Sequence, residues 1–230
     1  MEHQFQIPYS VQEKFPDKVL NKLRQNFISM IENENIQRTS YVLVSAYNLN
    51  HNQKIELIQL MLNMTADGIY LLNQSYAQAE QANLSNEFNP ILNYLTDYFF
   101  EVEDFRTDNF GPIGWIDDSY LCFSGLQQIN QIYASIYGKK LIEIELNPYI
   151  IFMRGLLSQD ELLELDKVLL EKFASIDWKN ILLKMAGVSF VNMIFGNNRG
   201  NQSSGGNSDG KSWERQMFES ASKLGIPINF

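Results

Sequence analysis

Hydrophobic residues recur at steps of three and four along most of this chain, which is the spacing of amphipathic α-helices. This periodicity predicts helices over residues 17–33, 55–81, 90–99, 120–137, 158–173 and 178–195. Only six prolines and 13 glycines interrupt the 230 residues, which favours long helices over many short strands. We therefore predict an all-α protein, mainly helical and built as a multi-helix bundle.

Two segments do not follow the helical spacing clearly. Tyr41 to Tyr47 is rich in β-branched and aromatic residues, and Leu141 to Ile151 alternates in part and contains Pro148. Each fits either a short extended piece or an interrupted helix. One or two short extended segments are therefore kept as an alternative, in addition to the predicted helices.

Three local signals refine the helical pattern. Ser158-Gln159-Asp160-Glu161 has the form of a capping box, so it predicts a helix start. Gly138 follows an apolar stripe and is typical of a helix C-terminus. The single cysteine, Cys122, lies in an apolar run and is expected to be a buried, inert core residue, since neither His3 nor His51 is expected near it.

Composition divides the chain into three parts. Residues 1–196 form the predicted helical domain. Residues 197–212 are rich in Gly, Ser and Asn, which predicts a flexible linker. Residues 213–230 carry apolar residues at helical spacing and predict a short C-terminal helix or tail, which either docks on its own domain or contacts a partner.

The chain has 27 acidic and 18 basic residues, a net charge of −9. This balance argues against binding to a nucleic-acid backbone, which needs clustered Lys and Arg. It is compatible with a basic protein partner, with cation binding, or with a surface that only keeps the protein soluble. Oligomeric state does not follow from these properties.

No secretory signal or transmembrane span is expected. The N-terminus has neither a basic start nor an apolar region. Ile181 to Phe195 is the nearest candidate for a membrane segment, but it is short and contains Lys184. A cytoplasmic protein is therefore expected, and peripheral membrane association through Ile181–Phe195 is kept as an alternative.

Residues 101–118 form the most distinctive segment of the chain. Six acidic residues surround the single base Arg106, and bulky apolar residues alternate with them. The interleaved apolar groups predict that the segment packs between helices. The acidic residues are Glu101, Glu103, Asp104, Asp108, Asp117 and Asp118.

Three interpretations of these acids compete. Asp117 and Asp118 would cap the N-terminus of the next helix and interact favourably with its dipole. Alternatively Asp104, Asp108, Asp117 and Asp118 together ligate a hard cation such as Mg²⁺ or Ca²⁺, although the EF-hand pattern is absent. A third option is a carboxylate-pair hydrolase, which needs a cleft.

The register of these residues resembles the YkvA-like domain of unknown function. Tyr98-Phe99-Phe100 leads into Asp104-x3-Asp108-x5-Gly114-x2-Asp117-Asp118. The similarity covers residues 92–131 and departs from the family at Thr107, where a proline is usual, and at Gly111-Pro112, where the second proline is displaced. It implies a compact, mostly bacterial helical hairpin with a tight acidic turn, and no established activity.

No P-loop, dinucleotide fingerprint, nucleophile elbow or zinc motif is present. This favours a non-enzymatic role without a cofactor. The first hypothesis is an acidic interaction protein, of the immunity or antitoxin type, that binds a basic protein. The second is a divalent-cation-binding protein or metal-dependent enzyme. The residues expected to contact a partner are Glu101, Glu103, Trp115, Trp213 and Phe218.

Overall fold

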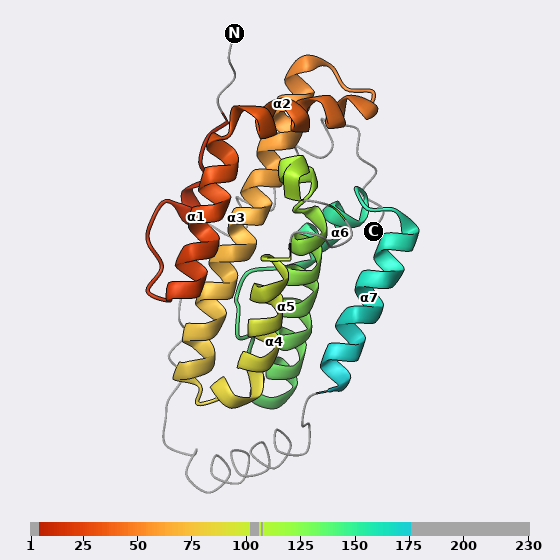
Figure 1. Cartoon of the computed structure of the whole chain (residues 1–230). Helices are drawn as coiled ribbons and strands as arrows, with labels where there is room; N and C mark the ends of the chain where they lie inside the picture. Colours follow the sequence, from red (N-terminus) through yellow and green to blue (C-terminus); the bar gives the residue numbers. More distant parts are fainter. Residues whose placement is uncertain (1–4, 102–105, 107, 176–230) are drawn as a thin grey trace, which may run out of the picture.

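The computed structural model describes residues 5–101, 106 and 108–175 of the chain. Within these residues there are seven α-helices, three 3-10 helices and no strand, so the predicted all-α class is confirmed (Figure 1). The elements are η1 (Tyr9–Val11), α1 (Lys18–Glu32), α2 (Glu34–Leu43), η2 (Val44–Ala46), α3 (His51–Gln81), α4 (Ser85–Tyr98), η3 (Asp108–Ile113), α5 (Ile116–Tyr137), α6 (Asn147–Arg154) and α7 (Gln159–Ala174).

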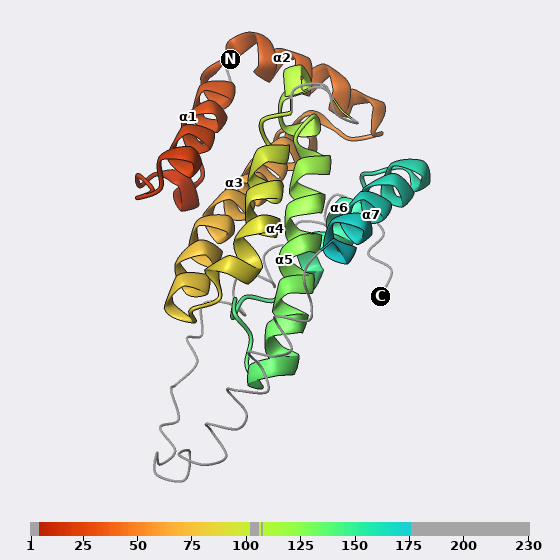
Figure 2. The same ribbon diagram turned by 60° about the horizontal axis from the view of Figure 1, so that its bottom comes forward.

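Helix α3 is the longest helix, and most other elements pack on it. Helices α1, α4 and α5 run alongside it, while α2 lies across one end of the bundle (Figures 1 and 2). A capping box closes its first turn: the Asn50 side chain accepts the backbone N–H of Gln53, and the Gln53 side chain accepts the backbone N–H of Asn50. A Cβ at Gly68 would lie 3.3 Å from the Phe123 ring, so this glycine lets α3 and α5 approach closely.

By length and composition alone, α3 could cross a membrane. However, 61% of its most apolar window is buried inside the protein. Its buried residues, such as Leu62, Ile69 and Leu72, contact the rest of the core. The core helix of a globular bundle has these same properties, so the apolarity of α3 is explained by its central position.

An aspartate caps the start of α1, and an asparagine forms the corner between α1 and α2. The Asp17 carboxylate accepts the N–H of Leu20 at 2.8 Å and starts α1. Asn33 ends α1, and its side chain then accepts the N–H groups of Asn35 and Ile36 at the start of α2. Residues 41–47 lie in α2, in η2 and at its C-cap, so the extended alternative for this segment is wrong.

Helices α4 and α5 pack side by side. Asn83, with φ 56°, makes the turn that leads into α4. Pro90 lies inside α4 and not in its first turn, because the helix begins five residues earlier than the sequence pattern indicated. Gly125 of α5 faces Leu95 so closely that a Cβ there would lie 2.8 Å from the leucine methyl groups.

The segment between α5 and α6 is irregular, and a side chain makes the hydrogen bonds that a neighbouring strand would make in a sheet. Asn130 donates to the carbonyl of Ile142 at 2.9 Å and accepts its N–H at 2.8 Å. Both backbone groups of this buried residue are thereby satisfied without a strand. Helix α5 ends at Gly138, whose φ of 67° confirms the predicted left-handed C-cap.

Helix α7 covers α5 on the side away from α3 (Figure 2). It starts as predicted, because Ser158 accepts the N–H of Glu161 and Glu161 accepts the N–H of Ser158. Full burial of a large apolar side chain stabilises the fold by about 1.5–3 kcal/mol. On α7 the buried residues are Leu162, Leu165, Leu169 and Phe173.

Residues 176–230 lie outside the described residues. The helix predicted over 178–195, the linker 197–212 and the tail 213–230 therefore stay predictions, and so does the domain boundary at residue 196.

Candidate functional site

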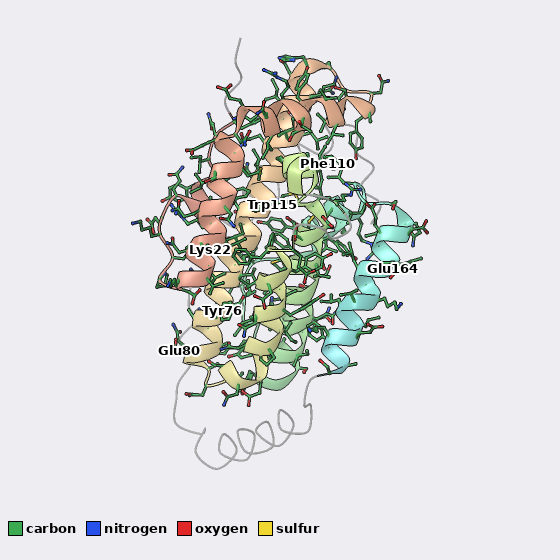
Figure 3. All side chains as sticks on the ribbon, viewed as in Figure 1. Lys22, Tyr76, Glu80, Phe110, Trp115 and Glu164 are labelled. Atoms are coloured by element: carbon green, nitrogen blue, oxygen red, sulfur yellow. The ribbon has the colours of Figure 1, made fainter. Side chains whose placement is uncertain are left out.

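The acidic segment leads from α4 into α5 through η3, which packs directly against α2. Gly111 is the point of closest approach. Its φ of 67° and ψ of −137° are open only to glycine, and a Cβ there would lie 2.5 Å from both Ile36 Cγ2 and Ser40 Oγ. The Ser40 hydroxyl also donates to the carbonyl of Phe110 at 3.1 Å. Figure 3 shows Phe110 beside the α2 end of the bundle.

Asp117 and Asp118 both lie in the first turn of α5, at the predicted helix end, but the N-cap residue is Trp115, so neither aspartate occupies the capping position. Both are buried, so they are not at a surface of the molecule. The Oδ2 atom of Asp117 accepts the backbone N–H of Arg106 at 3.2 Å. Burial raises the pKa of the nearby Cys122 thiol well above its usual range, and the charge of Asp118 adds to this effect. The cysteine is therefore an inert core residue.

Arg106 links the acidic segment to the start of α7. Its guanidinium binds Glu161 through two bonds, Nε to Oε1 at 2.7 Å and Nη2 to Oε2 at 3.0 Å. Nη2 also donates to the carbonyl of Leu156 at 3.2 Å. The hydrogen bond from Arg106 is the main reason that the pKa of Glu161 is lowered to about 2. The only base of the acidic segment is thus used in a structural contact.

A second polar network joins α5, α6 and α7. The Tyr120 hydroxyl donates to Asp166 Oδ1 at 2.7 Å and accepts a bond from Arg154 at 3.0 Å. Arg154 also lies 3.8 Å from Asp166. Burial, and then the bond to Asp166, raises the pKa of Tyr120 to about 12. The phenol stays neutral near pH 7, so it acts here as a hydrogen-bonding bridge.

Asp67 is a perturbed carboxyl that the sequence analysis missed. It lies on α3 and accepts the Tyr149 hydroxyl of α6 at 3.0 Å. Burial raises its pKa to about 6, against the lowering effect of hydrogen bonds from Ser10 and Tyr149. Burial also raises the pKa of Tyr149, whose ring stacks on Phe123 at 4.1 Å. The signal available in the sequence was a single acid inside the apolar run of 61–72.

The metal hypothesis places four aspartates together, and the structure describes only part of that set. Asp104 and the side chain of Asp108 lie outside the described residues. Asp117 and Asp118 are buried, and Asp117 is bound to Arg106. Among the residues that the structure describes, no group of three or more His, Cys, Asp or Glu side chains is arranged to hold a metal ion.

The residues predicted to contact a partner have different outcomes. Glu101 is exposed at the end of α4. Trp115 is only 4% exposed, with its ring 5.4 Å from Phe27 and 6.0 Å from Phe99, so the prediction that it contacts a partner is corrected (Figure 3). Its large apolar ring fills the core between α1 and α5. Glu103, Trp213 and Phe218 lie outside the described residues.

The side of α7 opposite its buried stripe has a different character. Leu163 is 57% exposed and Leu170 is 63% exposed, and their spacing of seven places them on one side of the helix. Three exposed acids and one exposed lysine share that side (Figure 3 labels Glu164). We call this surface the α7 outer face; it consists of Asp160, Leu163, Glu164, Lys167, Leu170 and Glu171.

The sequence pattern already held the signal for this face. In the helix predicted over 158–173, Leu162, Leu165 and Leu169 follow the helical spacing of the buried side, while Leu163 and Leu170 lie off it. Asp166 and Lys167 lie between these two leucines, so the two leucines are separate exposed residues.

Comparison with protein-family models, with curated proteins and with solved structures finds no match to the chain. The resemblance to the YkvA-like domain over residues 92–131 therefore stays a prediction.

Proposed function

We propose that this chain is an acidic helical interaction protein that binds a basic protein partner. The observation that carries the proposal is the excess of 27 acidic over 18 basic residues on a chain whose described part is a helical bundle. An excess of this kind creates a negative potential that attracts cationic surfaces and accelerates their association. It also repels nucleic-acid phosphates.

The location of the acids supports the proposal. We call residues 106–118, which lead through η3 into the first turn of α5, the α5 junction. Its Asp117 and Asp118 are buried, and Glu161 and Asp166 of α7 are paired with arginines. Other acids, including Glu13, Glu80 and Asp160, are exposed to solvent. Exposed acids of this kind are available to a partner without breaking a contact that holds the fold together.

An immunity or antitoxin-type role is the specific form of this proposal. Such a protein neutralises its partner by covering it, which requires a stable, complementary surface and no chemistry. Cytoplasmic localisation is part of the same proposal. The metal-dependent alternative has less support, because no group of three or more His, Cys, Asp or Glu side chains among the described residues is arranged to hold a metal ion.

Affinity purification tests the proposal. The tagged full-length chain is incubated with an extract of its source cell at low and at high salt, and the retained proteins are identified by mass spectrometry. We expect at least one retained protein with a pI above about 9, released by salt because the Debye length falls to ~3 Å at 1 M. Retention of acidic and neutral proteins only, at every salt concentration, would contradict the proposal.

A further inference from the structure

The described part of the chain begins with a short, mostly irregular segment that packs on α3. We call residues 5–12 the N-terminal strap; η1 forms its centre. Val11 is fully buried, whereas Tyr9 is 83% exposed. Apart from Pro8 and Val11, every residue of the strap is partly or fully exposed. The strap therefore contributes little apolar burial to the core.

Polar side chains of α1 and α3 hold the strap by its backbone. The Gln59 amide of α3 accepts the Gln6 N–H at 2.9 Å and donates to the Gln6 carbonyl at 2.9 Å. Arg24 of α1 donates to the carbonyls of Val11 at 2.7 Å and Gln12 at 3.0 Å. A segment with few buried apolar groups and a small number of polar bonds can open while the rest of the fold stays intact.

Asp67 of α3 is a carboxyl that joins the strap to α6. Its carboxylate accepts the Tyr149 hydroxyl of α6 at 3.0 Å and a hydrogen bond from the Ser10 hydroxyl of the strap. Gln59, Asn63 and Asp67 follow one another at steps of four along α3, and the Gln59 amide also donates to Asn63 at 3.0 Å. The strap thus lies against a row of polar side chains with a titratable group at its end.

The charged and titratable groups around Asp67 come from three neighbouring elements in addition to the strap. Burial raises the pKa of Tyr149, so this phenol stays neutral. Arg24 of α1 is bound to the strap carbonyls, and the charge of Asp118 of α5 acts on the buried Cys122 thiol. For Asp67 itself, burial is the largest influence, and it raises the pKa to about 6.

We propose that the N-terminal strap is a pH-dependent latch, which stays closed on α3 while Asp67 is protonated and opens more often once this carboxylate is ionised. A carboxylate that is shielded from water is costly to ionise. Opening of the strap gives water access to Asp67, so ionisation favours the open form. The latch does not require the proposed basic partner.

The direction of the effect follows from the two pKa values of Asp67. The value of about 6 in the closed form lies above the ordinary 3.8, so the stabilisation of the closed strap is complete below pH 3.8 and is lost as pH rises through 6. With the ordinary pKa restored in the open form, the equilibrium constant for opening rises about tenfold between pH 5 and pH 7.5. An open strap exposes Val11 and the polar row of α3.

Hydrogen exchange of single backbone amides, followed by NMR on the full-length chain at pH 5 and pH 7.5, tests the latch. The amides of Gln6, Val11 and Gln12 report on the strap, because each is hydrogen-bonded when the strap is closed. Ile69 and Leu72, buried in α3, report on unfolding of the core. After correction for intrinsic exchange rates, we expect strap protection factors below those of α3, with a fall of about tenfold at the higher pH.

Three variants assign the effect to Asp67 and to the strap. Asp67→Asn keeps an acceptor for Tyr149 but cannot ionise, so its strap protection should agree at the two pH values within about twofold. Glu80→Gln changes an exposed acid of the same helix (labelled in Figure 3), and this matched control should keep the tenfold fall. Gln59→Ala removes both bonds to Gln6 and should lower strap protection about fivefold at each pH value while the pH dependence stays.

Three results would overturn the latch. Strap amides protected as strongly as Ile69 and Leu72 would show that the strap opens only with the whole fold. Wild-type strap protection that is the same at pH 5 and pH 7.5 would show that opening does not release Asp67. A tenfold fall that persists in Asp67→Asn would assign the pH dependence to another group.

Discussion

The α5 junction and the α7 outer face are both acidic, yet they use their charge in opposite ways. At the junction, Asp117 and Asp118 are buried, and Arg106 connects Asp117 to Glu161. On the outer face, Asp160 and Glu164 lie in solvent beside exposed leucines. The first arrangement stabilises the fold, and the second is available to a partner.

The difference shows that a high local density of acids in the sequence does not mean that all of these acids lie at the surface. The acidic segment attracts attention in the sequence because six acids are close together. Burial, however, forces a carboxylate to find a hydrogen-bond donor or a cation within the protein. Helix α7, in which Asp160, Glu164 and Glu171 are exposed, has its acids spread along the helix and not clustered in the sequence.

The largest effect on stability is expected at Gly111, where η3 lies closest to α2. Gly111→Ala places a Cβ 2.5 Å from Ile36 and Ser40 at a positive φ, so we expect it to lower the free energy of unfolding by about 3–4 kcal/mol. Urea denaturation measures this. Gly138→Ala is the matched control, because its φ is also 67° but nothing lies within 4 Å; it should cost about 1 kcal/mol. Equal losses would show that the contact with α2 is unimportant.

Asp67 tests a partly buried carboxyl whose pKa is raised by burial. Its folded pKa of about 6 lies above the ordinary 3.8, so the stability linked to its protonated form is complete below pH 3.8 and is lost as pH rises through 6. Asp67→Asn keeps an acceptor for Tyr149 without the charge. We expect the variant to be more stable than wild type by about 2 kcal/mol at pH 7 and similar to it at pH 4.

Urea midpoints from pH 4 to pH 8 check this prediction. Tyr149→Phe serves as the control, because it removes the hydrogen bond and leaves the titrating group in place. An Asn variant whose advantage is the same at pH 4 and pH 7 would contradict a raised pKa at Asp67.

The pH dependence expected for Glu161 has the opposite sign to that of Asp67, because the hydrogen bond from Arg106 lowers the pKa of Glu161. Its folded pKa of about 2 lies below the ordinary 4.5, so its contribution is complete above pH 4.5 and is lost as pH falls toward 2. We expect Glu161→Gln to cost about 1–2 kcal/mol at pH 7 and little at pH 2.5. Stability measured by thermal or urea unfolding at both values checks this. A cost that does not depend on pH would mean that the lost capping bond to Ser158, and not the ion pair, is responsible.

The smallest effect is expected on the α7 outer face. Leu163→Ala and Leu170→Ala should each change the free energy of unfolding by less than about 0.5 kcal/mol, because these side chains are mostly in solvent. Leu165→Ala is the internal comparison and should cost about 2–4 kcal/mol, since Leu165 is fully buried. Similar costs for Leu163 and Leu165 would show that the outer face supports the fold.

Much of the architecture could be predicted from local pattern. The starts of α1 and α7 at Asp17 and Ser158, and the end of α5 at Gly138, depend on side-chain and backbone properties of a few neighbouring residues. Such signals are strong because capping and left-handed glycine energies are local. The buried position of Cys122 followed from its apolar neighbours in the same way.

The candidate site could not be predicted to the same extent. The contacts between helices decide that Trp115 fills the core and that Asp117 accepts the Arg106 N–H. Residues 41–47 have strand-like composition, yet they form the end of α2 and η2. Intrinsic β-propensity is weak, and the tertiary context overrides it here.

By itself, then, the sequence determined the helical class, both ends of α1 and α7, the C-terminal ends of α3, α4 and α5, and the excess of negative charge. Periodicity, capping and composition are properties of neighbouring residues. Only the tertiary structure decided which acids are buried and which are exposed. Burial depends on contacts between distant segments, such as Arg106 with Glu161 and Gly111 with Ile36. For that reason Asp117 and Asp118 became part of the core, while Asp160, Glu164 and Glu171 of α7 stayed exposed.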